Sequence, residues 1–157
     1  MSEIHAEGNA VIDARPEQIY AVLSDYHVGH PAILPKPPFT KLTIEEGGQG
    51  AGTVILVGMK VMGKEQIARG VVTEPEPGRK LVETYPESGI VTSFTVEPMN
   101  DGQQSRVTIA TDARTSPGFT GFIERLMFPS FLSRVYKAEL QQLADYVGGK
   151  RTSAKGG

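Results

Sequence analysis

The last third of the chain limits the possible folds most strongly. A helical pattern opens at Ser116-Pro117 and runs to Val147. In its second half the apolar residues form one narrow stripe, made of Tyr136, Leu140, Leu143 and Val147. In its first half they cover most of the circumference: Phe119, Phe122, Ile123, Leu126, Met127, Phe128, Phe131, Leu132 and Val135. The first half of the helix therefore needs apolar contact on several sides.

An apolar arc of this width on a small protein is either buried on two fronts or faces a ligand cavity. Dimerisation through the arc would cover it equally well. The chain before the helix has the pattern of strands, and these strands could cover a second side of the apolar arc. The sequence thus predicts a protein that encloses a ligand, and it does not indicate which ligand.

Strand patterns fill most of the chain before the helix. Residues 4–12 alternate loosely, and residues 39–114 contain about six further runs separated by turn motifs rich in Gly, Pro, Asn and Asp. Clean alternation in residues 94–96 and 107–111 indicates a sheet with one buried and one wet face. The short connections predict an antiparallel meander. Gly70, inside a strand pattern, is interpreted as a bulge or bend.

The remaining helices are short. Pro16 suits the first turn of a helix that carries Ile19, Val22 and Leu23 on one face. The prolines at 31, 35, 37 and 38 leave one helical turn around residues 32–34. Pro129 predicts a kink in the long helix or its division into two.

These elements predict an α+β fold. A sheet with one apolar face must cover it, and the last helix is the only element long enough. We expect a curved antiparallel sheet of about seven strands wrapped around a long C-terminal helix, with one or two short helices after the first strand. Residues 1–147 would form a single domain, and residues 148–157 a mobile tail without residues to pack.

Five segments in this order resemble the START/Bet v 1-like (SRPBCC) superfamily, and within it the polyketide cyclase/dehydrase-like and lipid-transport-like group. They are ARPEQIYAVLSDY (14–26), EGGQGAGT (46–53), VTEPEPGRKL (72–81), RVT (106–108) and ELQQL (139–143). The resemblance runs from about Ile4 to Val147, and its motifs concern turns and packing rather than catalysis. It implies the helix-grip fold, with a deep cavity between sheet and final helix that holds a hydrophobic molecule.

Composition excludes several classes of function. A net charge of −2 lacks the strongly basic balance of a nucleic-acid binder. With no cysteine there is no disulfide framework, thiolate nucleophile or thiolate metal site, and the iron–sulfur oxygenases of the superfamily are disfavoured. Residues 1–7 do not resemble a signal peptide, and no apolar run reaches membrane-spanning length. We expect a cytoplasmic protein without cofactor or transmembrane segment, either monomer or homodimer.

Metal binding is not favoured. His27 and His30 have a spacing that could bring two imidazoles together near Asp25, but His5, the third histidine, is remote. The glycine run at residues 47–52 precedes a strand rather than a helix, so it is a turn and not a phosphate-binding loop.

The groups available for acid–base chemistry could line a cavity or face water, depending on strand parity. No pair has a spacing that forces a catalytic arrangement. The pool consists of Tyr26, Glu65, Arg69, Glu83, Tyr85, Arg114 and Tyr136, and the candidate catalytic residues are His27, His30, Arg69 and Tyr85.

Binding of a small hydrophobic ligand, such as a lipid, isoprenoid or polyketide-like aromatic, is the leading hypothesis, and a carrier role would follow from it. The candidate ligand-binding residues are Tyr26, His30, Met59, Phe94, Phe119, Phe122, Leu126 and Met127. One alternative is a cyclase/dehydratase enzyme of the polyketide type. Another is a protein-interaction module resembling the co-chaperone members of the superfamily.

Overall fold

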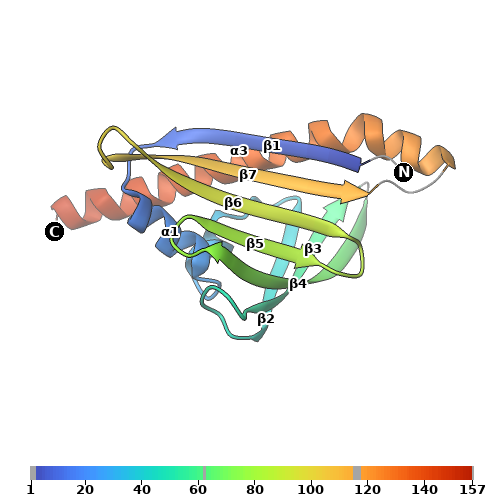
Figure 1. Ribbon diagram of the computed structural model, residues 1–157, viewed down its shortest axis with the longest axis horizontal. Helices are drawn as coiled ribbons and strands as arrows, with labels where there is room; N and C mark the ends of the chain where they lie inside the picture. The colour runs from blue at the N-terminus through green and yellow to red at the C-terminus, as the bar shows by residue number, and fades with distance from the viewer. Residues whose placement is uncertain (1–2, 62, 115–117, 157) are drawn as a thin grey trace.

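The computed structural model describes the backbone of residues 3–61, 63–114 and 118–156, and the side chains of residues 4–60, 63–114 and 129–148. A first strand is followed by two short helices, six more strands and one long helix (Figure 1). The elements are β1 (Glu3–Ile12), α1 (Pro16–Ser24), α2 (Gly29–Ile33), β2 (Phe39–Glu46), β3 (Val54–Val61), β4 (Lys64–Glu76), β5 (Lys80–Tyr85), β6 (Ile90–Met99), β7 (Gln104–Arg114) and α3 (Gly118–Gly156).

The seven strands form one antiparallel sheet in the order β1-β7-β6-β5-β4-β3-β2. Strands β2 to β7 follow one another as a meander, and β1 pairs with β7 at one edge. The strand direction changes strongly from β1 and β7 to β2 and β3, so the sheet is curved, and α3 runs along its concave side (Figure 1). The predicted helix-grip arrangement of about seven strands and a long C-terminal helix is confirmed.

The second short helix begins earlier than the sequence predicts. The prolines indicate one turn around residues 32–34, whereas α2 starts at Gly29. The Asp25 carboxylate accepts hydrogen bonds from the backbone N–H groups of His27 at 3.0 Å, Val28 at 3.2 Å and Gly29 at 3.2 Å. These N–H groups have no partner within the helix, so the aspartate satisfies them and sets where α2 begins.

Helix α3 is longer and less interrupted than the sequence predicts. It continues through Pro129 as one element, so the predicted division into two helices is wrong. A proline removes one backbone hydrogen bond, and the packing of Leu132 and Val135 just after it compensates for that loss. The helix also runs to Gly156, past Val147; the mobility of residues 148–157 stays a prediction. The described part of the chain contains no helix with the length and apolarity to cross a bilayer.

The core lies between the inner face of the sheet and the helices α1 and α3. Alternate residues of β5, β6 and β7 point inward, as the period of two in the sequence predicts. They meet the apolar stripe of α3, and the main contributors are Ile19, Leu23, Leu81, Phe94, Val96, Val107, Ile109, Leu140, Leu143 and Val147. At the β1 edge α3 comes close to the backbone, since a Cβ atom on Gly8 would lie 3.1 Å from the Cβ of Tyr136.

Replacing Leu143 by Ala should destabilise the fold, because this side chain is fully buried between α3 and the sheet. The expected loss is about 2–5 kcal/mol in the free energy of unfolding. Urea denaturation of the variant measures it. The matched control is Gln141→Ala on the exposed side of the same helix turn, which should change stability by no more than about 0.5 kcal/mol. Equal losses in both variants would contradict the packing described here.

Candidate ligand-binding cavity

A cavity of about 610 Å³ lies between the curved sheet, α2 and α3. This volume is in the range of roughly 300–1,000 Å³ that is typical of small-molecule sites. Most of its wall is apolar. The described lining residues are His30, Leu34, Phe39, Leu42, Val57, Met59, Lys64, Gln66, Ala68, Glu83, Tyr85, Ile90, Thr92, Phe94, Thr111, Leu132, Tyr136 and Glu139.

Strands β2 and β3 contribute apolar side chains to the wall, among them Phe39, Leu42 and Val57. Lys64 and Gln66 at the start of β4 also line the cavity, and both are exposed. The cavity therefore meets solvent near the start of β4, and its opposite end lies against β5, β6 and α3.

The inner end of the cavity is built around the Glu83 carboxylate, which is only 5% exposed. Its Oε1 accepts a hydrogen bond from the Tyr85 hydroxyl at 2.7 Å, and its Oε2 accepts one from the Tyr26 hydroxyl at 2.7 Å. His30 Nε2 lies 3.4 Å from the same Oε2. A buried carboxylate is costly unless it is hydrogen-bonded, and the two tyrosine hydroxyls reduce that cost.

The His30 ring is held in one orientation from several sides. Its Nδ1 lies 2.7 Å from the Leu23 backbone oxygen. A carbonyl oxygen can only accept, so Nδ1 carries a proton and Nε2 is the nitrogen that faces Glu83. The ring stacks on Tyr26 with centroids 4.4 Å apart, and it meets Phe94 edge-on at 5.2 Å.

The loop at residues 47–52 supports Tyr26 from outside the cavity. The Tyr26 N–H donates to the Gly48 oxygen at 2.9 Å, and the Gly50 N–H donates to the Ser24 oxygen at 2.9 Å. Gly50 has a φ of +56°, and a Cβ atom there would lie 2.3 Å from a Glu74 carboxylate oxygen. The loop leads into β3, as expected of a turn rather than a phosphate-binding loop.

Gly70 makes room for Tyr85 and does not form a bulge, so that part of the interpretation from sequence is wrong, whereas the bend stays a prediction. The pairing of β3 with β4 runs without a register shift through Gly70. A Cβ atom on Gly70 would lie 2.7 Å from Cε1 of the Tyr85 ring. The missing side chain thus lets the ring lie over β4 while its hydroxyl reaches Glu83.

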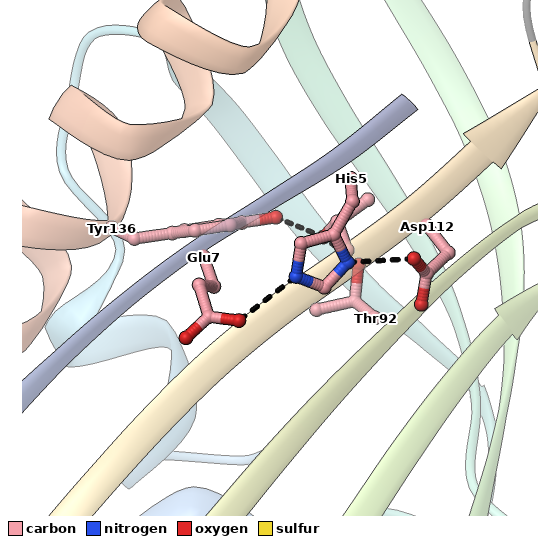
Figure 2. Close-up of polar contacts among 6 residues, drawn as sticks. His5, Glu7, Thr92, Asp112 and Tyr136 are labelled. Carbon is pink, nitrogen blue, oxygen red and sulfur yellow. Dashed lines mark hydrogen bonds and ion pairs between the residues drawn. The ribbon is translucent and has the colours of Figure 1, made fainter. Parts of the chain in front are cut away.

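A second set of polar groups crosses the wall from β6 to α3. Thr92 Oγ1 lies 2.7 Å from Thr111 Oγ1, and Thr111 also hydrogen-bonds with the Tyr136 hydroxyl. In Figure 2, Tyr136 and Thr92 lie behind β1 and β7, whereas the His5 ring lies in front of these strands. Burial, as the main cause, raises the pKa of the Tyr136 hydroxyl, so this hydroxyl stays protonated.

His5 lies on the outer face, so it cannot join the other two histidines at one metal. Its ring contacts Asp112 at 2.7 Å and Glu7 at 2.8 Å (Figure 2). Hydrogen bonds to Glu7 and Asp112 raise the pKa of this exposed imidazole. Within residues whose side chains are described, no group of three His, Asp or Glu side chains has the arrangement of a metal site.

Glu139 of α3 brings a second carboxyl group to the cavity. It is 2% exposed and lines the wall. Burial, and then the negative charge of Glu83, raise the pKa of Glu139 well above its usual range. The same two causes, in the same order, raise the pKa values of the Tyr26 and Tyr85 hydroxyls. The inner end therefore holds one hydrogen-bonded carboxylate and one carboxyl group that favours its neutral form.

The candidate residues from the sequence divide between the cavity and the surface. His30, Tyr85, Met59 and Phe94 line the cavity, and Tyr26 lies behind Glu83. The candidate ligand-binding side chains of Phe119, Phe122, Leu126 and Met127 lie outside the described residues.

Two candidate catalytic residues lie away from the cavity. His27 is exposed and lies beside Gly48, because the turn after Asp25 directs it outward. Arg69 is exposed on β4, where its Nε lies 2.6 Å from Glu45 Oε1. Its neighbours Ala68 and Gly70 take the inward positions, so strand parity directs the guanidinium to solvent.

Sequence reasoning did not single out Glu139, Thr92 or Thr111. A signal for Glu139 exists, since it follows Tyr136 by three residues and precedes Leu143 by four, which places it on the apolar stripe. A charged residue on such a stripe is unusual. Glu83 was one member of a larger pool, and its inward direction follows from alternation with Leu81 and Tyr85.

Solved structures that share this fold over nearly the whole chain include the following three. The KanY protein is 28% identical, with a TM-score of 0.80 over 94% of this chain and 99% of that one. The Zhui aromatase/cyclase from a Streptomyces species is 20% identical, with a TM-score of 0.74 over 97% and 96%. A START superfamily protein from Mycobacterium smegmatis is 13% identical, with a TM-score of 0.69 over 92% and 97%.

No curated protein matches the sequence. The family model described as "Polyketide cyclase / dehydrase and lipid transport" matches residues 3–148, which include every strand and the packed part of α3. The match covers the same residues that build the cavity. This chain therefore belongs to the polyketide cyclase/dehydrase and lipid transport family.

Proposed function

We propose that this protein binds a small molecule with an apolar body and a polar end. The observation that carries the proposal is a largely apolar cavity of about 610 Å³ that ends at two buried carboxyl groups, Glu83 and Glu139. A core that served only packing would be filled by side chains. A hydrophobic ligand role or a cyclase role is also what membership of the family supports.

The apolar wall would supply most of the affinity. Each methylene group moved from water into such a wall contributes about 0.8 kcal/mol. The polar end would fix the orientation, because an apolar group placed against Glu83 or Glu139 would leave their hydrogen-bonding capacity unused. The contacts of the side chains at residues 119–127 are not described, so the protein-interaction hypothesis stays a prediction.

Filling the cavity from β4 should weaken binding without changing the outer surface. Ala68 lines the cavity, so Ala68→Phe should reduce the affinity for the fluorescent probe N-phenyl-1-naphthylamine by about tenfold or more, which corresponds to about 1.4 kcal/mol. Fluorescence titration measures this change. The control is Ile67→Phe, because Ile67 is the neighbouring residue and is 51% exposed. If Ala68→Phe bound the probe as well as Ile67→Phe, the probe would not occupy this cavity.

A second function, enzymatic proton transfer, is favoured by the contacts of Glu83. Its carboxylate lines the cavity while two tyrosine hydroxyls and His30 hold it in place. A carboxylate fixed in this way can take a proton from the carbon next to a ligand carbonyl, and the C–H electron pair then forms the enolate. Cyclisation and dehydration of polyketide-like substrates both begin with such a proton transfer.

The exchange of carbon-bound hydrogen tests this second function. In heavy water the protein should accelerate deuterium uptake by the methyl group of 2-acetylnaphthalene, and Glu83→Gln should reduce that rate by about a hundredfold or more. Proton NMR follows the methyl signal. Glu87→Gln is the control, because Glu87 is exposed and outside the cavity lining. An unaccelerated exchange with bound ketone would leave the protein as a binder rather than an enzyme.

A further inference from the structure

The two carboxyl groups at the inner end of the cavity have different surroundings. Glu83 on β5 accepts hydrogen bonds from Tyr26 and Tyr85, and His30 Nε2 lies beside it. Glu139 on α3 is buried and lies within the electrostatic reach of Glu83. The site therefore stabilises different forms of the two groups. Glu83 is stabilised as a carboxylate that accepts hydrogen bonds, and Glu139 is stabilised as a neutral carboxylic acid.

Most hydroxyl donors around Glu139 are already used. Tyr26 and Tyr85 donate to Glu83, and the Tyr136 hydroxyl is engaged with Thr111. Among the described lining residues the basic side chains are Lys64, exposed at the start of β4, and His30, which faces Glu83. A protonated Glu139 would add a hydroxyl donor to the inner end, where the fixed charge is negative.

We propose that Glu139 presents a protonated carboxyl group to the cavity, that this group donates a hydrogen bond to a neutral carbonyl oxygen of the ligand, and that anionic ligands are rejected. This inference rests on the proposed binding function and names the ligand class. A carbonyl oxygen only accepts, which matches a carboxylic acid as donor. A carboxylate ligand would add a negative charge next to Glu83 in a poorly hydrated site, which is strongly disfavoured. A buried carboxylic acid that stays neutral in order to donate is a known device of enzyme sites.

The pH dependence follows from the groups that face Glu139. These are Glu83 and Tyr85 from β5, Tyr26 from the α1–α2 region, and Tyr136 from α3; His30 lines the same cavity and faces Glu83. Burial and the charge of Glu83 raise the pKa of Glu139. The donor is present below that raised pKa and is lost as the pH rises through it.

Three probes with one ring system test the ligand class: 2-acetylnaphthalene, 2-isopropenylnaphthalene, in which C=CH₂ replaces C=O, and 2-naphthoate. At about pH 6 the protein should bind the ketone about five- to tenfold more tightly than the alkene, as expected of one hydrogen bond, and should bind the naphthoate most weakly. The preference for the ketone should fall as the pH is raised. Isothermal titration calorimetry measures all three affinities.

Two substitutions separate donation from packing. Glu139→Gln keeps an N–H donor, so the preference for the ketone should persist at every pH. Glu139→Leu removes the donor and makes this part of the wall apolar, so the preference should disappear and the alkene should bind at least as tightly as the ketone. A ketone preference that survives in Glu139→Leu would overturn the inference and leave the binding function intact. If neither the ketone nor the alkene binds the unchanged protein, the proposed binding function fails and the ligand class fails with it.

The protonation of Glu139 is also testable without any ligand. The pKa of Glu139 in the folded protein is raised above its usual value of 4.5, so the folded state holds this proton after the unfolded chain has released it. The unchanged protein should therefore lose stability relative to Glu139→Gln as the pH rises from 4.5 through the raised pKa. Urea denaturation of both proteins at a series of pH values measures the difference between their free energies of unfolding. The contributions of the other titrating groups cancel in this difference. Infrared difference spectra at neutral pH should show a protonated carboxyl C=O band that Glu139→Gln lacks, and absence of that band would overturn the inference.

Discussion

One long helix, helped by the short α1, must cover one face of a seven-stranded sheet, and this constraint determines the rest of the structure. Seven strands spaced about 4.8 Å apart extend about 29 Å across, whereas a helix with its side chains is about 10 Å wide. A flat sheet would leave most of its apolar face in water. The sheet curves instead and brings both halves toward α3 (Figure 1). Gly8 lets α3 come close to β1, so the space remains toward β2, β3 and β4, where the cavity lies.

Polar groups inside such a cavity must hydrogen-bond to one another, because the apolar wall offers no donors or acceptors. Glu83 meets this requirement through the hydroxyls of Tyr26 and Tyr85, which come from the α1–α2 region and from β5. Their positions depend on structure outside the cavity. Asp25 sets the start of α2, and Gly70 leaves room for the Tyr85 ring. Turns and glycines that look like mere scaffold therefore fix the geometry of the inner end.

The fold could be predicted from sequence because its signals are local and repeated. Alternation in residues 107–111, turn residues at 100–102 and the stripe of Leu140, Leu143 and Val147 each indicate one element, and together they leave few arrangements. The start of α2 was missed because it depends on hydrogen bonds to the Asp25 carboxylate rather than on periodicity. Pro129 left a kink or a division of the long helix as alternatives, and the sequence could not decide between them because tertiary packing can outweigh a local preference.

The cavity was harder to predict because its polar end is assembled across the sheet. Glu83 and Glu139 are 56 positions apart in sequence, and nothing local indicates that they share a space. Once they do, their protonation states cannot be independent, because the negative charge of Glu83 acts on Glu139 in a poorly hydrated site. Tyr26 and Tyr85 donate their hydrogen bonds to Glu83, so Glu139 is the carboxyl group that stays neutral. Two residues of the same type thereby acquire opposite hydrogen-bonding roles, one accepting and one donating, and a ligand that carries both an acceptor oxygen and an acidic hydrogen can engage both.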